Sequence, residues 1–268
     1  MAKEPWNAVQ EGKARQGARE IIVKLNIRHP SEINIEAIAF YHKIWVKECK
    51  LDKTDGYLIR KGEKVCIFVN QGIELTRKRF TIAHELGHFM LHSKESQLNL
   101  CLTEDFQYSY KYLSPNEEEA NIFVGELLMP QGLFTAAIGK STPSIQKVQE
   151  LAKEFQTSLT ATAIRYMELC SFTCAVVFSK DGKIKWFKPS EYFNPRITVG
   201  MKVPEDSNAA KLHAGETAVT RFNRLPIGSW ISSKSLDRSD WIEEQAIPLP
   251  AYGSVMTLLW MKQSDEES

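Results

Sequence analysis

The sequence predicts an α+β protein in which helices dominate the N-terminal part and strands the C-terminal part. Apolar residues recur at helical spacing up to about residue 172, apart from one short group of strand-like runs, and strand-like runs prevail after it. With 268 residues, 43% of them hydrophobic, the chain can form one large or two modest domains. We divide it into residues 1–140, a helical segment 141–172, and an α+β region 173–268.

Composition excludes several classes of protein. The 34 Lys and Arg residues nearly balance the 33 Asp and Glu residues, so no global charge draws the chain to nucleic acid or anionic lipid. No apolar run approaches the ~18 residues of a membrane span, and the N-terminus lacks the apolar core of a secretion signal. We therefore expect a cytoplasmic protein. Five cysteines without a C-x-x-C pair support neither a disulfide framework nor a four-thiolate zinc site, so buried free thiols are expected.

The first elements follow from periodicity. Apolar residues at helical spacing predict a helix over residues 12–25, ended at His29-Pro30, and a second over residues 35–42. Residues 44–69 contain three strand-like runs separated by Asp55-Gly56 and Lys61-Gly62 turn signals. We expect a small antiparallel sheet there.

Two further helices surround an irregular, polar stretch at residues 93–111. The first ends at about His92 and carries three of the six histidines. The second begins at Ser114, which can cap it, has Pro115 in its first turn, and ends at Met129-Pro130.

The C-terminal elements are a helical pair and a set of strands. The pair covers residues 144–168, with a polar break at 156–158. Strand-like runs follow at 174–178, 184–187 and 255–261.

The segment His84-Glu85-Leu86-Gly87-His88 carries the clearest chemical signal. Residues four apart on a helix differ by ~40° around the axis and ~6 Å along it, so both imidazoles can bind one metal ion. Glu85 lies about 100° from His84, which suits a base that takes a proton from metal-bound water. Such a pattern arises by chance in roughly one chain in a hundred of this histidine content.

Zinc is the expected ion, because nitrogen and oxygen ligands with one open position favour it, although manganese or iron would accept the same ligands. A third protein ligand is needed. His92 lies ~12 Å along the axis from His84, too far to share the metal. We interpret it as a supporting residue or an ordinary, partly buried histidine.

Glu117 is the best third ligand, because it shares the buried stripe of the following helix, whereas Glu119 points more outward. Its competing role is a capping box with Ser114, in which its side chain would fold back on its own backbone.

These residues resemble the ImmA/IrrE family of zinc metallopeptidases. The resemblance covers roughly residues 10–135 and is carried by the run Arg79-Phe80-Thr81-Ile82-Ala83-His84-Glu85-Leu86-Gly87-His88, by Leu91-His92, by the upstream segment Cys66-Ile67-Phe68-Val69-Asn70, by Glu117-x-x-Ala120-Asn121 and by Leu127-Leu128-Met129-Pro130. It implies a mostly helical, zincin-like peptidase domain with zinc bound by His84, His88 and Glu117, and Glu85 as the base. Further along the chain it implies a helix-turn-helix-like segment and then a GAF-like domain that senses a signal or docks a partner.

The implied activity is cleavage of a helix-turn-helix repressor protein, which switches on stress-response or mobile-element genes. Two alternatives remain open at the level of sequence. The chain could be a DNA-binding regulator, for which the helical pair offers few basic residues (Lys147, Lys153 and Arg165), or a sensor or scaffold with a relic metal site. Spacing does not select the oxyanion-stabilising group among Tyr110, Tyr112 and His92.

Overall fold

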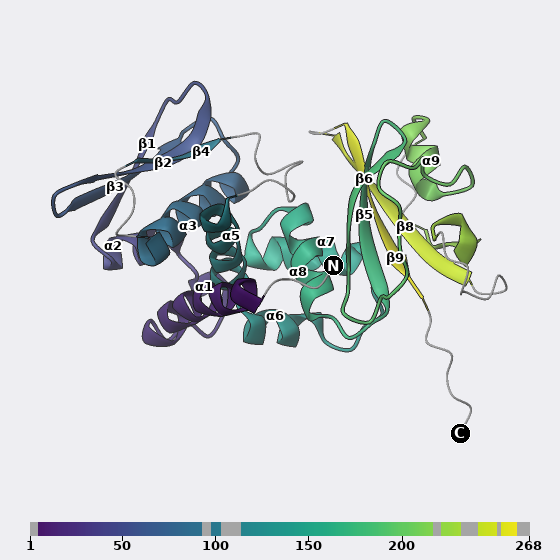
Figure 1. Ribbon diagram of the computed structural model, residues 1–268, viewed down its shortest axis with the longest axis horizontal. Coiled ribbons are helices and arrows are strands. Elements are labelled where there is room, and N and C mark those ends of the chain that lie inside the picture. Colours follow the sequence, from purple (N-terminus) through teal and green to yellow (C-terminus); the bar gives the residue numbers. More distant parts are fainter. Residues whose placement is uncertain are drawn as a thin grey trace. The chain divides into compact units, whose positions relative to one another are not determined.

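The computed structural model confirms a mixed α+β protein (Figure 1) and describes residues 5–92, 98–102, 114–216, 221–231, 241–250 and 253–261. The chain forms two compact units. The first comprises residues 1–136 with 152–158, and the second comprises residues 137–151 with 159–268.

The first unit contains the helices expected near the N-terminus. They are α1 (Pro5–Lys24), α2 (Ile35–Tyr41), α3 (Leu75–His92) and α5 (Pro115–Leu128), with a 3₁₀ turn at Pro30–Glu32. A further helix, α6 (Gln131–Ile138), follows and ends two residues into the second unit. Helix α6 was not expected, because Pro130 was interpreted only as the end of α5. Proline is also well tolerated where a helix begins, and the Pro130 carbonyl accepts the Phe134 N–H at 2.8 Å.

A four-stranded sheet covers one side of α3 in this unit (Figure 1). Its strands are β1 (Ile44–Cys49), β2 (Thr54–Lys61), β3 (Lys64–Asn70) and β4 (Leu98–Leu102), in the order β1-β3-β2-β4. The expected antiparallel sheet is wrong for β1, which runs parallel to β3 with Ile44 opposite Val65. Because β2 and β3 form a hairpin, β1 pairs with the free edge of β3 and runs in the same direction.

Strand β4 corrects a second expectation, since it lies within the stretch interpreted as irregular. Its sequence alternates Leu98, Leu100 and Leu102 with other residues, a strand pattern that the polar flanks obscured. It pairs antiparallel with β2, which places Leu100 opposite Tyr57.

The core of the first unit holds α3 between the sheet and the other helices. Val65, Ile67 and Val69 of β3 are buried, as are Ile82 and Leu86 of α3. Helix α5 packs against both α1 and α3. The histidine-bearing helix is therefore fixed from several sides.

The second unit is built on a five-stranded antiparallel sheet. Its strands are β5 (Cys174–Lys180), β6 (Lys183–Pro189), β7 (Asn223–Pro226), β8 (Trp241–Leu249) and β9 (Ser254–Trp260), in the order β6-β5-β9-β8-β7. Helix α8 (Leu159–Leu169) packs on β5 and β6, and α9 (Asn208–His213) packs on β8 and β9. A 3₁₀ turn covers Ile227–Ser229, and α7 (Ile145–Phe155) contributes residues to both units.

The expected helical pair and the three expected C-terminal strands are present, whereas α9, β7 and β8 had not been expected. The helix-turn-helix-like and GAF-like descriptions of this region stay predictions. Among the described residues, no single helix is both long and apolar enough for a membrane span, and α5 and α6 meet that test only jointly, across a 58° bend.

Candidate metal centre

Helix α3 and the first turn of α5 bring three side chains to one point. The Nε2 atoms of His84 and His88 lie 3.0 Å apart. The Glu117 carboxylate faces both, with 3.0 Å from Oε2 to His84 Nε2 and 3.1 Å from Oε1 to His88 Nε2. Nitrogen and oxygen atoms that share this spacing on separate elements form a set capable of holding a metal ion.

The spacing of these atoms fits a tetrahedral metal. Ligand atoms at the usual zinc distances of about 2.1 Å are separated from one another by about 3.4 Å in a tetrahedral site. The observed separations of 3.0–3.1 Å are close to that value. Two imidazole nitrogens and one carboxylate oxygen are also a ligand set of catalytic zinc sites.

Glu117 reaches the histidines because α5 approaches α3 closely. A Cβ atom at Gly87 would lie 3.1 Å from Phe123 Cδ1 and 3.4 Å from Ala120 Cα, so glycine permits the approach. Ser114 caps α5 by accepting a hydrogen bond from the Glu117 N–H at 3.4 Å. Of the two roles weighed for the Glu117 side chain, the structure places it at the histidines and not on its own backbone.

Glu85 lies on the buried side of α3 with an exposed fraction of 0%. Neither carboxylate oxygen makes a hydrogen bond of good geometry within the described part of the chain. Burial, followed by the negative charge of Glu117, raises the pKa of Glu85 to about 8, against the opposing effect of the Leu58 backbone N–H. A buried carboxyl group with a raised pKa is a candidate for proton exchange in a functional site.

The pKa values of Glu117 and His84 are lowered, in contrast to that of Glu85. Burial favours the neutral form of Glu117, but the hydrogen bonds from His84 and His88 outweigh it and hold its pKa well below the usual range. Burial also lowers the pKa of His84, despite its contact with Glu117. An ionised carboxylate beside a neutral imidazole is the protonation state that a metal ion requires.

A second set of residues contacts the remaining imidazole nitrogens. His84 Nδ1 lies 3.1 Å from Asn121 Oδ1, and His88 Nδ1 lies 3.2 Å from His92 Nδ1. His92 Nε2 lies in turn 3.0 Å from Glu119 Oε2. His92 therefore supports a predicted ligand and does not join the three converging groups.

Glu119 corrects an expectation, because it was interpreted as outward-pointing but its side chain is only 15% exposed. His92 lies one turn beyond His88 on α3 and so meets a different side of α5. The role of Asn121 was also missed, although the residue belongs to the Glu117-x-x-Ala120-Asn121 motif; its place one turn after Glu117 was the available signal.

Three other predictions concerned two tyrosines, a basic residue of the helical pair and the cysteines. Tyr110 and Tyr112 lie outside the described residues. Arg165, one of the basic residues weighed for DNA binding, is 2% exposed and pairs with Glu168 at 3.1 Å, so it is not available to a phosphate. Cys170 and Cys174 are buried free thiols, as expected, with Sγ atoms 3.3 Å apart. Cys49 and Cys66 are free but only partly buried, so the expectation of burial is wrong for these two.

Comparisons with known proteins agree with the site. Residues 39–167, which include both histidines and Glu117, match the family described as IrrE N-terminal-like domain, Peptidase_M78. The matched segment, just under half of the chain, is similar to the ImmA/IrrE family. The chain is also 24% identical over 144 residues to Metallopeptidase ImmA of Bacillus subtilis (strain 168), an alignment that covers 52% of this chain and 79% of that protein.

The whole fold also resembles a solved structure. A Mycobacterium tuberculosis transcriptional regulator superposes with a TM-score of 0.60 at 12% identity, covering 93% of this chain and 76% of the other. At that identity the likeness concerns the fold alone. The family and the converging ligand set together indicate a metallopeptidase.

Proposed function

We propose that this protein is a zinc-dependent endopeptidase that cleaves a partner helix-turn-helix transcriptional repressor in the cytoplasm and so derepresses stress-response or mobile-element genes. One observation carries the proposal. The ligand atoms of His84, His88 and Glu117 converge within 4.8 Å of one another, and the buried carboxyl group of Glu85 lies on α3 beside the two histidines.

His84, His88 and Glu117 would hold the ion. Zinc is the ion we propose, and manganese would accept the same ligands. When bound, it supplies an electrophile for the peptide carbonyl and a water molecule acidic enough to ionise near neutral pH.

Glu85 would act as the general base and then as the general acid. A carboxylate oxygen of Glu85 takes the proton of the attacking water and later delivers it to the nitrogen of the leaving amine. Its burial excludes bulk water from this exchange. The proton thus stays on one side chain between the two halves of the reaction.

The remaining parts of the chain would select the substrate. We assign the peptidase domain to residues 1–140, a helical segment to 141–172, and a GAF-like domain that docks the repressor or senses a signal to 173–268. Membrane attachment and DNA binding form no part of this proposal.

The test uses, as the candidate substrate, a helix-turn-helix repressor encoded next to this gene or elsewhere in the same genome. The purified, zinc-loaded chain and its Glu85→Gln variant are each incubated with that repressor, and the products are identified by mass spectrometry. We expect one cleaved bond with the wild type and none with the variant. Equal cleavage by both would refute the role of Glu85, and intact repressor in both would refute this substrate.

A further inference from the structure

A chain of hydrogen bonds extends from His88 on the side opposite to Glu117. His88 Nε2 faces Glu117, while its other nitrogen, Nδ1, lies 3.2 Å from His92 Nδ1. His92 Nε2 lies 3.0 Å from Glu119 Oε2. The side chains of His92 and Glu119 are 8% and 15% exposed, so water competes little for these contacts.

The protons of this series of hydrogen bonds can be placed by starting either from the metal site at His88 or from Glu119. A metal at His88 Nε2 needs the lone pair of that atom, so the ring proton must sit on Nδ1 and be donated to His92 Nδ1. A neutral His92 that accepts at Nδ1 carries its own proton on Nε2 and donates it to Glu119. Starting from Glu119 leads to the same arrangement, because an ionised carboxylate only accepts.

We propose that His92 and Glu119 are positioning residues that hold His88 in the tautomer and ring orientation required for metal binding. The negative charge of Glu119, transmitted through His92, also makes His88 Nε2 a stronger electron donor. This inference rests on the proposed metal function and deepens it.

The second ligand provides an internal comparison. His84 Nδ1 faces the neutral amide oxygen of Asn121 at 3.1 Å, so no charge stands behind that ring in this contact. The support of the two histidines is therefore unequal. Loss of the Glu119 charge should act on His88 and leave the geometry of His84 intact.

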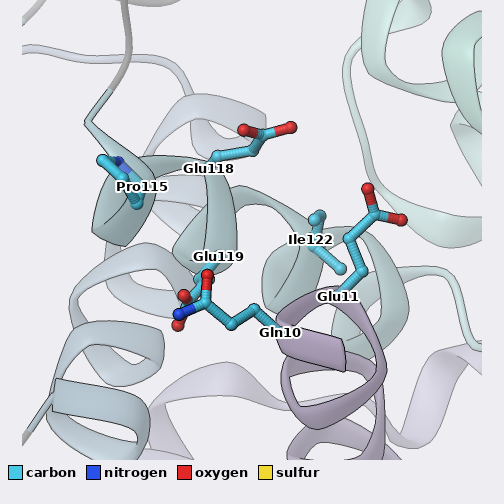
Figure 2. A pocket seen from close by; sticks show the side chains of 6 residues that line it. All are labelled: Gln10, Glu11, Pro115, Glu118, Glu119 and Ile122. Carbon is cyan, nitrogen blue, oxygen red and sulfur yellow. The ribbon is translucent and has the colours of Figure 1, made fainter. Parts of the chain in front are cut away.

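Glu118 supplies a matched control. It follows Glu117 on α5 and carries the same charge as Glu119, but its side chain is exposed. Both acidic residues line a hollow at the start of α5, together with Gln10 and Pro115. Figure 2 shows the two carboxylates directed to different sides of the helix. Changing Glu118 alters the net charge equally without removing the contact with His92.

The experiment compares the wild type with the Glu119→Ala, Glu119→Gln and Glu118→Ala variants of the full chain. Zinc affinity is measured by competition with a chromophoric chelator, and the Tm of the zinc-depleted protein is measured in parallel. Glu119→Ala should lower zinc affinity about 10- to 100-fold. Glu119→Gln should lower it less, because its amide oxygen still accepts the His92 proton, and Glu118→Ala should leave it unchanged.

Nitrogen-15 NMR of the histidine rings supplies a readout that a merely structural contact would not affect. In the zinc-loaded wild type we expect His88 protonated at Nδ1 and His92 at Nε2. In the zinc-depleted proteins Glu119 alone can fix the ring protons, so the wild type should keep this arrangement and Glu119→Ala should show a mixture of His92 tautomers. If Glu119→Ala does not fold, Glu119→Gln, which has the same shape, provides the affinity comparison.

The outcomes separate this inference from the proposed function. Wild-type affinity in both Glu119 variants, or a wild-type His92 protonated at Nδ1, would overturn the positioning role while zinc binding stands. A wild-type protein that binds no zinc would overturn both proposals.

Discussion

Replacing Glu117 with glutamine should weaken zinc binding by about two orders of magnitude. Glu117 is the one charged member of the converging set and contacts both histidines. Protein sites with zinc-finger ligands bind the ion with ~10 kcal/mol or more at pH 7, and a third of that is roughly 3 kcal/mol, or about a hundredfold in Kd. Glutamine keeps the length and hydrogen-bonding oxygen but removes the charge, so the loss reports on ligation and not on packing.

Thermal unfolding with and without zinc measures this effect. At a zinc concentration about 100 times the wild-type Kd, the ion stabilises the wild type by about 2.7 kcal/mol, but a variant with a hundredfold weaker site by only about 0.4 kcal/mol. For a domain of this size these energies correspond to Tm increases of roughly 5–10 °C and about 1 °C. Glu118→Gln is the control and should behave as the wild type. A full Tm increase in Glu117→Gln, together with its loss in His84→Ala, would show that the third ligand lies elsewhere.

Three further predictions address the base, the packing of α3 and the second unit. Glu85→Gln should retain wild-type zinc affinity in the chelator assay while peptidase activity falls by about 10²–10⁴-fold; weaker zinc binding would instead make Glu85 a ligand. Gly56→Ala should lower the free energy of unfolding by roughly 1–3 kcal/mol in urea titrations, because its Cβ would lie 2.5 Å from Thr81 Cγ2 on α3. Gly12→Ala on α1, whose Cβ meets nothing within 4 Å, should raise the free energy of unfolding by up to about 1 kcal/mol. Equal effects of the two substitutions would contradict the packing at Gly56. Burial raises the pKa of Glu244, so the folded protein retains a proton that the unfolded chain loses near pH ~4.3. The stability of the wild type relative to Glu244→Gln should therefore fall as the pH rises from there through the folded-state pKa, by at most about 1.4 kcal/mol per pH unit. A flat or rising difference in urea titrations across pH 4–7 would refute this prediction.

The converging residues of the candidate site could be predicted because each depends on local geometry. Two histidines four apart on one helix share a face whatever surrounds the helix. Ser114 and Pro115 define where α5 begins, and this start places Glu117 one turn before Ala120 and two turns before Val124 of the buried stripe of α5. The choice between ligand and capping box was not local, because it depended on whether another helix came close enough to attract the carboxylate.

The errors in the fold concern pairing between strands distant in sequence. Each strand of the first sheet was visible as a run of apolar residues except β4, yet no run states its partner. Strand β1 joins the edge of β3 that β2 leaves free, although β3 lies beyond β2 in the sequence. Alternation within a strand carries no information about which edge it will meet.

The supporting residues required knowledge of how two helices meet. Glu117 and Glu119 are two positions apart on α5, so their side chains leave the helix on nearly opposite sides, and an apolar stripe on one side predicts that the other points to solvent. That reasoning fails here because α3 is long enough to meet both sides: His88 reaches Glu117, and His92, one turn further along, reaches Glu119. Only the close approach of the helices at Gly87 brings both contacts within hydrogen-bonding distance. A bulkier residue at position 87 should therefore disturb both the His88–Glu117 contact and the His92–Glu119 contact, although Gly87 takes part in neither.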